Sequence, residues 1–417
     1  MYVGVPQPEP WRRPRLGRCR RRRNAASWPR RGRAACWQAR LVDKPLATSV
    51  ADALRSGYVS AASLPCHYTV DEEAIVPVIS VPQVFNEDEL YVDLRSIFGH
   101  SLFLKCEGFN FAGSIKLKAA TEMVEAAERD GVLTPGSVLV ESSSGNLGVA
   151  LSMIAASKGY RFLCVTDSRC NLSTRRMMEA LGSQVHIIAE PDANGGLLGA
   201  RINYIRGLCA SDDRYVWLNQ YTNPGNWQAH YRRTAPAIVR QFPRLDVLFV
   251  GAGTTGTLMG CARFLREWHR PVRIIAVDAA GSVTFGGPPG RRMIPGLGMS
   301  VRPPLLDESY VDEVVLVEEP DGIRACHRLA RRGFLFGGST GTVVSGAMGW
   351  LAQHDARELT AVAIAPDLGE RYLDTVYQTN WLEDLYGGDV LSSDELTVSS
   401  RASLTRTTDA VTGALVT

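Results

Sequence analysis

The chain has 417 residues and a mass of 45.5 kDa, with 45% hydrophobic and 21% charged residues. These values are typical of a globular protein with a large core, and they exclude global disorder, a collagen-like fibre and a small disulfide-stapled fold. The chain has 46 basic and 43 acidic residues, and the part beyond residue 40 has 34 basic and 42 acidic residues. The net charge of +3 therefore arises from an Arg-rich start. The acidic remainder predicts no nucleic-acid or membrane partner.

Residues 1–60 form an Arg-rich leader that lacks the apolar stretch of a secretory signal. Three interpretations stand: a translated stretch upstream of the true start, a disordered basic arm, and an organelle transit peptide. The Pro content and the lack of apolar periodicity favour disorder. The sequence has no uninterrupted run of 18 apolar residues, so we predict no membrane span. Nine Cys without a CxxC pair or a neighbouring His cluster indicate a reducing compartment, taken as the cytoplasm, and no metal site.

Hydrophobic patterning predicts a helix at 49–59 and an extended segment at 74–85. From about residue 100, short apolar strands alternate with helices. Strands are predicted at 101–107, 137–146 (running into a loop), 161–167, 184–190, 246–253, 272–279, 311–319 and 359–366. Helices are predicted at 113–131, 147–159, 173–182, 200–211, 257–269, 323–333 and 342–353.

Apolar strands that alternate with helices are typical of parallel sheets covered on both faces. The predicted fold class is therefore α/β, with two three-layer αβα domains, mostly parallel sheets and a cleft between them. The large domain is expected to comprise 61–109 plus 224–385, and a small mobile domain 110–223. Residues 386–417 have few large apolar side chains and are expected to form a disordered tail.

Four Gly- or hydroxyl-rich loops follow predicted strands. In the first, GAGTTG at 251–256 opens a helix, and Asp278 ends the next strand 22 residues after Gly256. This spacing matches a dinucleotide-binding fingerprint. The loop also suits a single phosphate monoester, bound by the N–H groups of residues 253–257 at the helix start, with hydroxyls from Thr254, Thr255 and Thr257. A tight turn without a ligand is the third interpretation.

The second loop ends in Lys116 at a helix start. A lysine there is usually a solvated surface residue; alternatively, its amine loses its proton beside a bound cofactor and acts as nucleophile and base. The third loop, ESSSGNLG at 141–148, suits a substrate carboxylate, although Ser or Asn helix caps give the same pattern. The fourth, GGSTG at 337–341, presents Ser339 either to a ring nitrogen or as a helix cap.

The four loops together predict one ligand at the carboxyl ends of the strands. One loop supplies a lysine and another suits a phosphate. A phosphate-bearing aldehyde bound as an imine uses both groups, and pyridoxal 5′-phosphate is such a molecule. NAD needs no lysine and would leave the other three loops without a role.

The motifs GSIK, ESSSGNLG, GAGTTGTLMG, GGSTG and GERYLDTVY, spread over about residues 76–385, resemble those of the fold-type II pyridoxal-phosphate enzymes related to cysteine synthase. The segments EPDANGG, LNQYTNPGNWQAHY, VDAAGSVTFG and PGLG resemble the branch that makes N-(2-amino-2-carboxyethyl)-L-glutamate for 2,3-diaminopropionate. Around the lysine the usual pattern is NPGGSxKDR, from which this chain departs at Phe111, Ala112, Leu117 and Lys118. It also has Gly253 where Ser is expected in a close relative.

The resemblance implies a role for each matched residue. Lys116 would bind the cofactor covalently and act as general base. Asn146 would bond the 3′-oxygen of the cofactor and Ser339 its pyridine nitrogen, which would stay largely unprotonated. The cofactor phosphate would lie on Gly253, Thr254, Thr255, Gly256 and Thr257. The substrate would lie on Ser143, Ser144, Gly145, Gln220, Tyr221 and Arg201. Arg201 suits a phosphate or a carboxylate, although a helix-surface arginine gives the same signal.

The implied reaction is a β-replacement on O-phospho-L-serine with the α-amine of L-glutamate as nucleophile, during which the small domain closes and excludes water. Alternatives are a cysteine synthase that uses sulfide with O-acetylserine or O-phosphoserine, a cofactor-binding regulatory homologue without turnover, and, more distantly, an NAD dehydrogenase. The resemblance also implies a homodimer, small amino-acid substrates, and a pathway to a siderophore or a peptide antibiotic.

Overall fold

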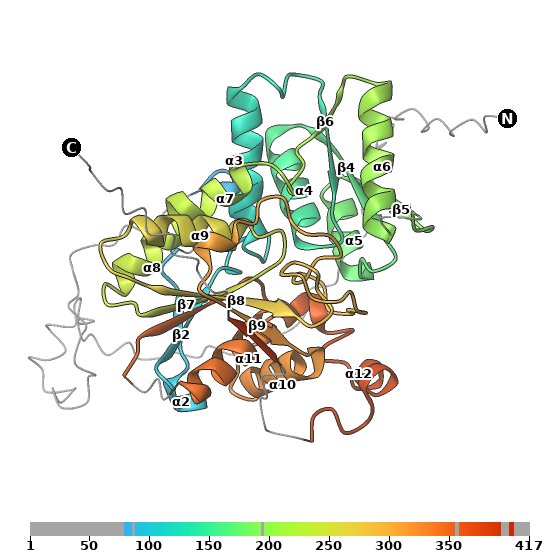
Figure 1. Ribbon diagram of the computed structural model, residues 1–417. Coiled ribbons are helices and arrows are strands. Elements are labelled where there is room, and N and C mark those ends of the chain that lie inside the picture. The colour runs from blue at the N-terminus through green and yellow to red at the C-terminus, as the bar shows by residue number, and fades with distance from the viewer. Residues whose placement is uncertain (1–78, 86–87, 193–195, 355–357, 393–399, 404–417) are drawn as a thin grey trace, which may run out of the picture. The chain divides into compact units, whose positions relative to one another are not determined.

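The computed structural model describes residues 79–85, 88–192, 196–354, 358–392 and 400–403 (Figure 1). The predicted leader and the predicted helix 49–59 lie outside the described residues. The described end of the segment 74–85 is not extended as predicted. Pro82–Val84 form the 3₁₀ turn η2, in which the Phe85 N–H donates to the Pro82 carbonyl over 3.3 Å. The Pro82 ring fixes φ in the range that this turn needs.

Four parallel strands form the smaller sheet, in the order β5-β4-β3-β6. They are β3 (Val138–Ser142), β4 (Arg161–Asp167), β5 (Gln184–Ile188) and β6 (Tyr215–Trp217). The helices around this sheet are α3 (Lys116–Arg129), α4 (Asn146–Lys158), α5 (Leu172–Ala180) and α6 (Gly196–Ser211). Side chains alternate along β3, so that Leu139 packs with α3, α4 and α5 while Val140 packs with α6 on the other face (Figure 1).

Seven strands form the larger sheet, in the order β1-β2-β10-β7-β8-β9-β11. The edge strands β1 and β11 pair antiparallel with their neighbours, and the strands between them are parallel. The strands are β1 (Tyr91–Asp93), β2 (Leu102–Cys106), β7 (Val247–Gly251), β8 (Arg273–Ala279), β9 (Glu313–Val317), β10 (Ala361–Ala365) and β11 (Ser400–Ser403).

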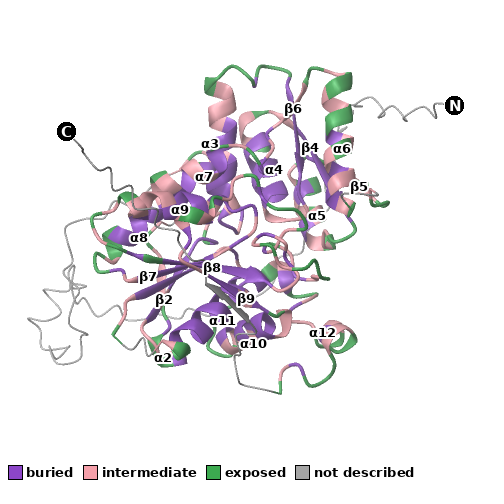
Figure 2. Cartoon of the chain, viewed as in Figure 1, coloured by how far each residue is buried: buried purple, intermediate pink, exposed green. Residues whose placement is uncertain are grey.

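Helices cover both faces of the larger sheet. On one face lie α2 (Arg95–Phe98), α10 (Glu319–Ala330) and α11 (Gly338–Gln353), and on the other α8 (Ala235–Gln241) and α9 (Gly256–Glu267) (Figure 1). Alternate residues of β7 enter the two cores: Phe249 packs on the α11 side, and Leu248 and Val250 on the α9 side. Figure 2 shows that the central strands of both sheets are buried between their helices. This arrangement confirms the predicted α/β class with two mostly parallel sheets.

Each of the predicted strands and helices between residues 101 and 366 has its counterpart in the structure. The prediction missed the short strands β1, β6 and β11 and the turn between α7 and α8. It also missed the short helices α2, α7 (Gly225–Ala229), α8 and α12 (Thr379–Tyr386). Strand β6 is half-buried along its whole length, so it shows no alternation of apolar and polar residues.

The helical segment from α7 to α8 contains the π-helical turn η3 (His230–Thr234), in which the Ala235 N–H donates to the His230 carbonyl five residues earlier. Pro236 follows directly and has no N–H to donate. A proline ring also clashes with the carbonyl four residues before it. The wider turn removes this conflict and lets the chain continue as a helix.

The range 386–417, predicted to be a disordered tail, includes packed residues. Tyr386 ends α12, and Val390 is buried with Ile323 and Leu382. The backbone of Ser400–Ser403 pairs with β9. The packed part of the chain therefore extends beyond Leu385. Among the described residues, no helix is long and apolar enough to cross a membrane, and the six described cysteines are free.

A buried ion network joins the start of α3 to strand β2. The ammonium groups of Lys105 and Lys118 lie 2.8 and 2.7 Å from the carboxylate of Glu107, and all three side chains are fully buried. Lys118 also contacts Asp88 over 2.5 Å. Lys118 is one of the departures from the usual pattern near Lys116, and here its charge anchors the helix on which Lys116 lies.

We expect Glu107→Ala to lower the free energy of unfolding by about 3–5 kcal/mol, because it leaves the buried ammonium of Lys105 without a carboxylate and that of Lys118 with Asp88 alone. Urea unfolding followed by circular dichroism measures this change. Arg240→Ala is the matched control: its pair with Glu89 is more than 60% exposed on both sides, so we expect a loss of at most about 1 kcal/mol. An equal, small loss in both variants would contradict the importance of the network.

Candidate active site

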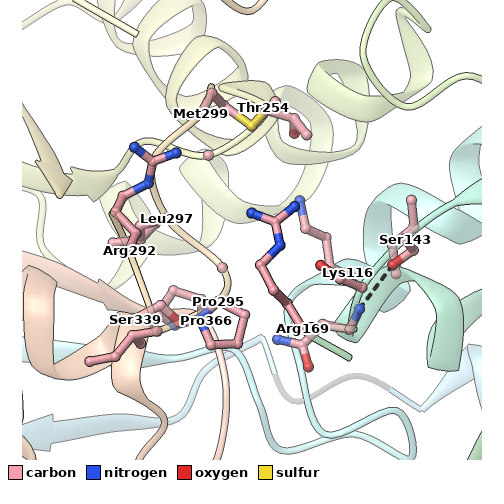
Figure 3. A pocket seen from close by; sticks show the side chains of 18 of the residues that line it. Lys116, Ser143, Arg169, Thr254, Arg292, Pro295, Leu297, Met299, Ser339 and Pro366 are labelled. Carbon is pink, nitrogen blue, oxygen red and sulfur yellow. Dashed lines mark hydrogen bonds between the residues drawn. The ribbon is translucent and has the colours of Figure 1, made fainter. Parts of the chain in front are cut away.

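A cavity of about 190 Å³ lies where the strands of both sheets end. Its walls include the loops after β3, β4, β7 and β10 and the segment 292–300 that follows β8 (Figure 3). The carboxyl ends of parallel strands meet at one edge of a sheet, and helices that begin there direct backbone N–H groups toward a ligand. The architecture therefore produces the convergence of loops that the motifs predict.

Most of the predicted site residues line this cavity. They are Lys116, Ser143, Ser144, Gly145, Asn146, Arg201, Gln220, Tyr221, Gly253, Thr254 and Ser339. Thr255, Gly256 and Thr257 are not among the lining residues. The placement brings the four loops together but does not by itself assign a role to each residue.

Lys116 is the first residue of α3 and lies in the cavity wall (Figure 3). Among the described residues, no side chain forms an ion pair or a hydrogen bond with its amine. Burial alone lowers the pKa of Lys116 to about 8, because the charged ammonium loses its hydration without gaining a partner. An amine with this pKa is partly neutral near pH 7 and is a better nucleophile than a surface lysine.

In the loop after β3, Ser143 accepts hydrogen bonds at the start of a helix and keeps its own hydroxyl proton. Ser143 Oγ accepts hydrogen bonds from the N–H groups of Gly145 and Gly148, at 3.2 and 3.0 Å. This is the helix-capping interpretation, and it leaves the hydroxyl proton of Ser143 free to be donated into the cavity. Asn146 begins α4, and its side-chain amide donates to Asp367 in the segment after β10.

Asp367, which the sequence analysis did not select, connects the two helix starts at the cavity. Its buried carboxylate accepts hydrogen bonds from Ser339 Oγ at 2.7 Å, Tyr372 Oη at 2.5 Å and Asn146 Nδ2 at 2.9 Å. Burial raises the pKa of Asp367, and these three donors oppose that rise. Arg371 donates to the side-chain oxygen of Asn146 from the other side. The two side chains expected to contact a cofactor ring are thus held by one carboxylate.

The loop between β7 and α9 has the shape of a phosphate site. Gly253 is packed so closely that a Cβ would lie 2.7 Å from the Gly296 carbonyl oxygen, and Thr255 adopts a left-handed backbone with φ of 65°. The Thr254 hydroxyl accepts from Asn226 Nδ2 over 3.0 Å. The first N–H groups of α9 have no partner within the helix and are available to an anion.

The dinucleotide interpretation of this loop has no support in the structure. Gly256 is required by helix packing, since a Cβ there would lie 2.1 Å from Asn226 Oδ1. Thr257 bonds to His230 Nε2 at 3.2 Å. Asp278, the expected ribose ligand, is buried, accepts from the Ala279 N–H at 2.9 Å and does not line the cavity.

Arg201 lies in the wall formed by the smaller sheet. It is 4% exposed and pairs with Asp167 over 3.3 Å, while its Nη1 has no hydrogen-bond partner. It is therefore not a helix-surface arginine. Gln220 is fixed beside it by donating to the Ser142 carbonyl over 2.8 Å, and Tyr221 approaches the same serine. An unpaired buried guanidinium N–H is costly unless a ligand accepts from it.

The cavity is strongly cationic. Its lining includes the side chains of Lys116, Arg169, Arg201, Arg292 and Arg371, and none of the described lining residues is Asp or Glu. The sequence analysis missed Arg169, Arg292 and Arg371. Arg371 lies in the motif GERYLDTVY, and Asp367 directly follows an apolar parallel strand, which is a position where site residues gather.

A phosphate-bearing aldehyde fits these residues. The helix start of α9 supplies N–H groups for the phosphate, and Lys116 supplies an amine of lowered pKa in the same cavity. Asn146 supplies a polar contact for a ring that carries an oxygen, and Ser339 lines the same cavity.

Comparison with known proteins agrees with this chemistry. The family described as "Pyridoxal-phosphate dependent enzyme" matches residues 91–367. N-(2-amino-2-carboxyethyl)-L-glutamate synthase from Ralstonia nicotianae is 41% identical over 283 residues, which are 67% of this chain and 83% of that protein. A hydrogen sulfide-producing enzyme from Fusobacterium nucleatum is 31% identical with a TM-score of 0.63, over 66% of this chain and 93% of its own. O-ureido-L-serine synthase is 31% identical with a TM-score of 0.67, over 74% and 96%.

The family match spans strands of both sheets and ends at Asp367, so every wall of the cavity except Arg371 and Tyr372 lies within it. The chain belongs to the pyridoxal-phosphate dependent enzymes, and its cofactor is pyridoxal 5′-phosphate.

Proposed function

We propose that this enzyme catalyses a β-replacement in which L-glutamate displaces phosphate from O-phospho-L-serine, giving N-(2-amino-2-carboxyethyl)-L-glutamate for 2,3-diaminopropionate synthesis. The observation that carries the proposal is the cationic lining of the cavity, with five cations and no lining carboxylate among the described residues. Each proposed substrate has two anionic groups and the cofactor has a phosphate, whereas O-acetylserine and hydrosulfide have one anionic group each. The similarity to the Ralstonia nicotianae synthase supports the same substrates.

The cofactor would be held mostly by residues that line the cavity, together with Thr255, Gly256 and Thr257, which follow the lining residues Gly253 and Thr254. Lys116 would bind its aldehyde carbon, and the N–H groups of residues 253–257 would bind its phosphate. Asn146 and Ser339 would contact the ring. The donor would place its α-carboxylate on Ser143, Ser144, Gly145 and Gln220, and its phosphate near Arg201 and Tyr221.

The reaction needs one proton to be moved twice. When bound, the cofactor accepts the electron pair that the Cα–H bond releases. Lys116 would take the Cα proton, and the Cβ–O bond would break with its electrons on the leaving phosphate. The glutamate amine would then form the Cβ–N bond and lose a proton, and Lys116 would return a proton to Cα. Release of one phosphate for each product balances the atoms.

Two further features expected from the family resemblance remain predictions. One is the division into a large domain (61–109 plus 224–385) and a small mobile domain (110–223), and the other is a homodimer.

The rate at which the apoenzyme takes up pyridoxal 5′-phosphate is expected to rise about tenfold from pH 7 to pH 9 and then level off, because only the neutral amine of Lys116 reacts and the pKa of Lys116 is about 8. An ordinary lysine with a pKa near 10.4 would give a rise of about a hundredfold without levelling. Stopped-flow absorbance of the bound cofactor measures the rate, with Lys116→Ala as the control that forms no covalent band.

Asp367→Ala is expected to weaken binding of pyridoxal 5′-phosphate about tenfold or more, because Ser339 and Asn146 lose the carboxylate that holds them. Fluorescence titration of the apoenzyme measures this affinity. Asp374→Ala removes an exposed carboxylate from the same segment and should leave the affinity unchanged. Equal affinity in all three proteins would show that Asp367 does not organise the site.

The donor is tested by the visible absorption spectrum of the holoenzyme. O-phospho-L-serine should shift the cofactor band, and L-glutamate should restore it with release of phosphate and of the product mass. A shift with O-acetylserine that only sulfide reverses would instead identify a cysteine synthase. No response to any donor would identify a non-catalytic homologue.

Arg201→Gln should raise the KM for O-phospho-L-serine about tenfold or more and leave that for O-acetylserine within about twofold, because only the phosphate uses the guanidinium. Steady-state kinetics with both donors measures the effect. Arg206→Gln, on the exposed side of the same helix, is the matched control. A similar loss with both donors would place the phosphate elsewhere.

A further inference from the structure

Arg292 enters the cavity from the segment 281–300, on the side of the larger sheet (Figure 3). Its guanidinium donates to the Gly281 carbonyl and, over 3.2 Å, to Ser300 Oγ. No carboxylate oxygen of the described residues lies within ion-pair distance of it. Burial lowers the pKa of Arg292, the carboxylate of Asp278 opposes this, and the positive charge of Arg169 adds to it.

The backbone around Arg292 fixes its direction. Gly298 has a φ of 74°, and a Cβ at this position would lie 2.8 Å from Arg292 Nε. Only glycine adopts this conformation readily, and only glycine leaves room for the side chain. The guanidinium is therefore held in place before any ligand arrives, which reduces the entropy lost on binding.

Arg169 approaches the cavity from the smaller sheet, on the side of Lys116 and Ser143 (Figure 3). Its Nε and Nη2 donate to the Asp167 carboxylate over 3.2 and 3.0 Å. The same carboxylate pairs with Arg201 over 3.3 Å. Asp167 thus places Arg169 next to the proposed donor site and offsets part of the charge of both arginines. Arg292 has no such ion pair among the described residues, although the charges of Asp278 and Glu319 act on it from farther away.

The other cations of the cavity already have partners or proposed roles. Arg371 donates to Asn146 and to the Ala112 carbonyl, and so supports the cofactor end. Lys116 is assigned to the cofactor and Arg201 to the phosphate of the donor. Arg292, which has no ion pair among the described residues, and Arg169, which is paired only with Asp167, have no ligand assigned to them.

We propose that Arg292 and Arg169 form the acceptor subsite, which binds an amino acid through two carboxylates and leaves its amine free to attack. Arg169 lies on the donor side and would bind the α-carboxylate next to that amine. Arg292 lies on the opposite wall and binds the side-chain carboxylate, for which its planar donor groups are suited. This inference rests on the proposed function, and it makes Arg292 the residue that selects a dicarboxylic acceptor.

The test compares L-glutamate with L-glutamine, which has the same shape but no side-chain carboxylate. In the wild-type holoenzyme saturated with O-phospho-L-serine, kcat/KM should be at least about tenfold higher for glutamate. Arg292→Gln should reduce this preference to about threefold or less by raising the KM for glutamate. Arg292→Lys, which keeps the charge but not the paired donors, should fall between them. Arg291→Gln changes the neighbouring exposed arginine, which does not line the cavity, and should behave as wild type.

Two readouts separate the possible failures. The spectral response to O-phospho-L-serine alone reports the fold, the cofactor and the donor site, and it should be unchanged in all three variants. Glutarate, which has both carboxylates but no amine, should inhibit competitively against glutamate, with an inhibition constant raised about tenfold in Arg292→Gln.

If the wild type does not use glutamate, the proposed function fails. If it does and Arg292→Gln keeps the preference for glutamate, only the acceptor subsite is wrong. If Arg292→Gln does not fold, an unchanged preference in Arg292→Lys likewise overturns it.

Discussion

The polar framework of the active site depends on one buried carboxylate. Asp367 accepts hydrogen bonds from side chains at the starts of α4 and α11 and from Tyr372. A carboxylate removed from water at this depth is tolerated only because several donors surround it. The backbone of Gly337 lies so close to the Asp367 carboxylate that a Cβ at this position would be only 2.2 Å from it. Because the donors belong to helices of different sheets, this single group sets the position of both walls of the cavity.

Buried carboxylates also offset part of the positive charge of the cavity. The cavity places its carboxylates behind the lining: Asp167 serves Arg169 and Arg201, and Asp367 lies near Arg371. Burial lowers the pKa of Lys116, so its amine is partly neutral. The remaining positive charge is therefore left for ligands. An empty cavity of this kind repels cations and concentrates anions, which favours association with phosphorylated and dicarboxylic amino acids.

Sequence patterns were sufficient for the fold class, and most of the site residues that they predicted do line the cavity. Fully apolar strands require helices on both faces, and parallel strands bring the loops after them to one edge, so GSIK, ESSSGNLG, GAGTTG and GGSTG had to lie close together. Spacing alone was misleading at Gly256, because close packing against Asn226 requires a glycine there whether or not a ligand binds. Asp367 was missed because its partners are set by tertiary contacts. The bond from Asn146 to Asp367, for example, spans 221 residues.

The π-helical turn at His230–Thr234 has a consequence for how this enzyme can vary. One residue in an α-helix corresponds to a rotation of about 100°. Deleting one residue from this turn would restore the regular ladder but would rotate α8 relative to α7. Ala235, Ile238 and Val239 would then leave the core that they share with α9. Insertions and deletions in this segment are therefore restricted by packing, and homologous chains that keep Pro236 are expected to keep the length of the turn before it.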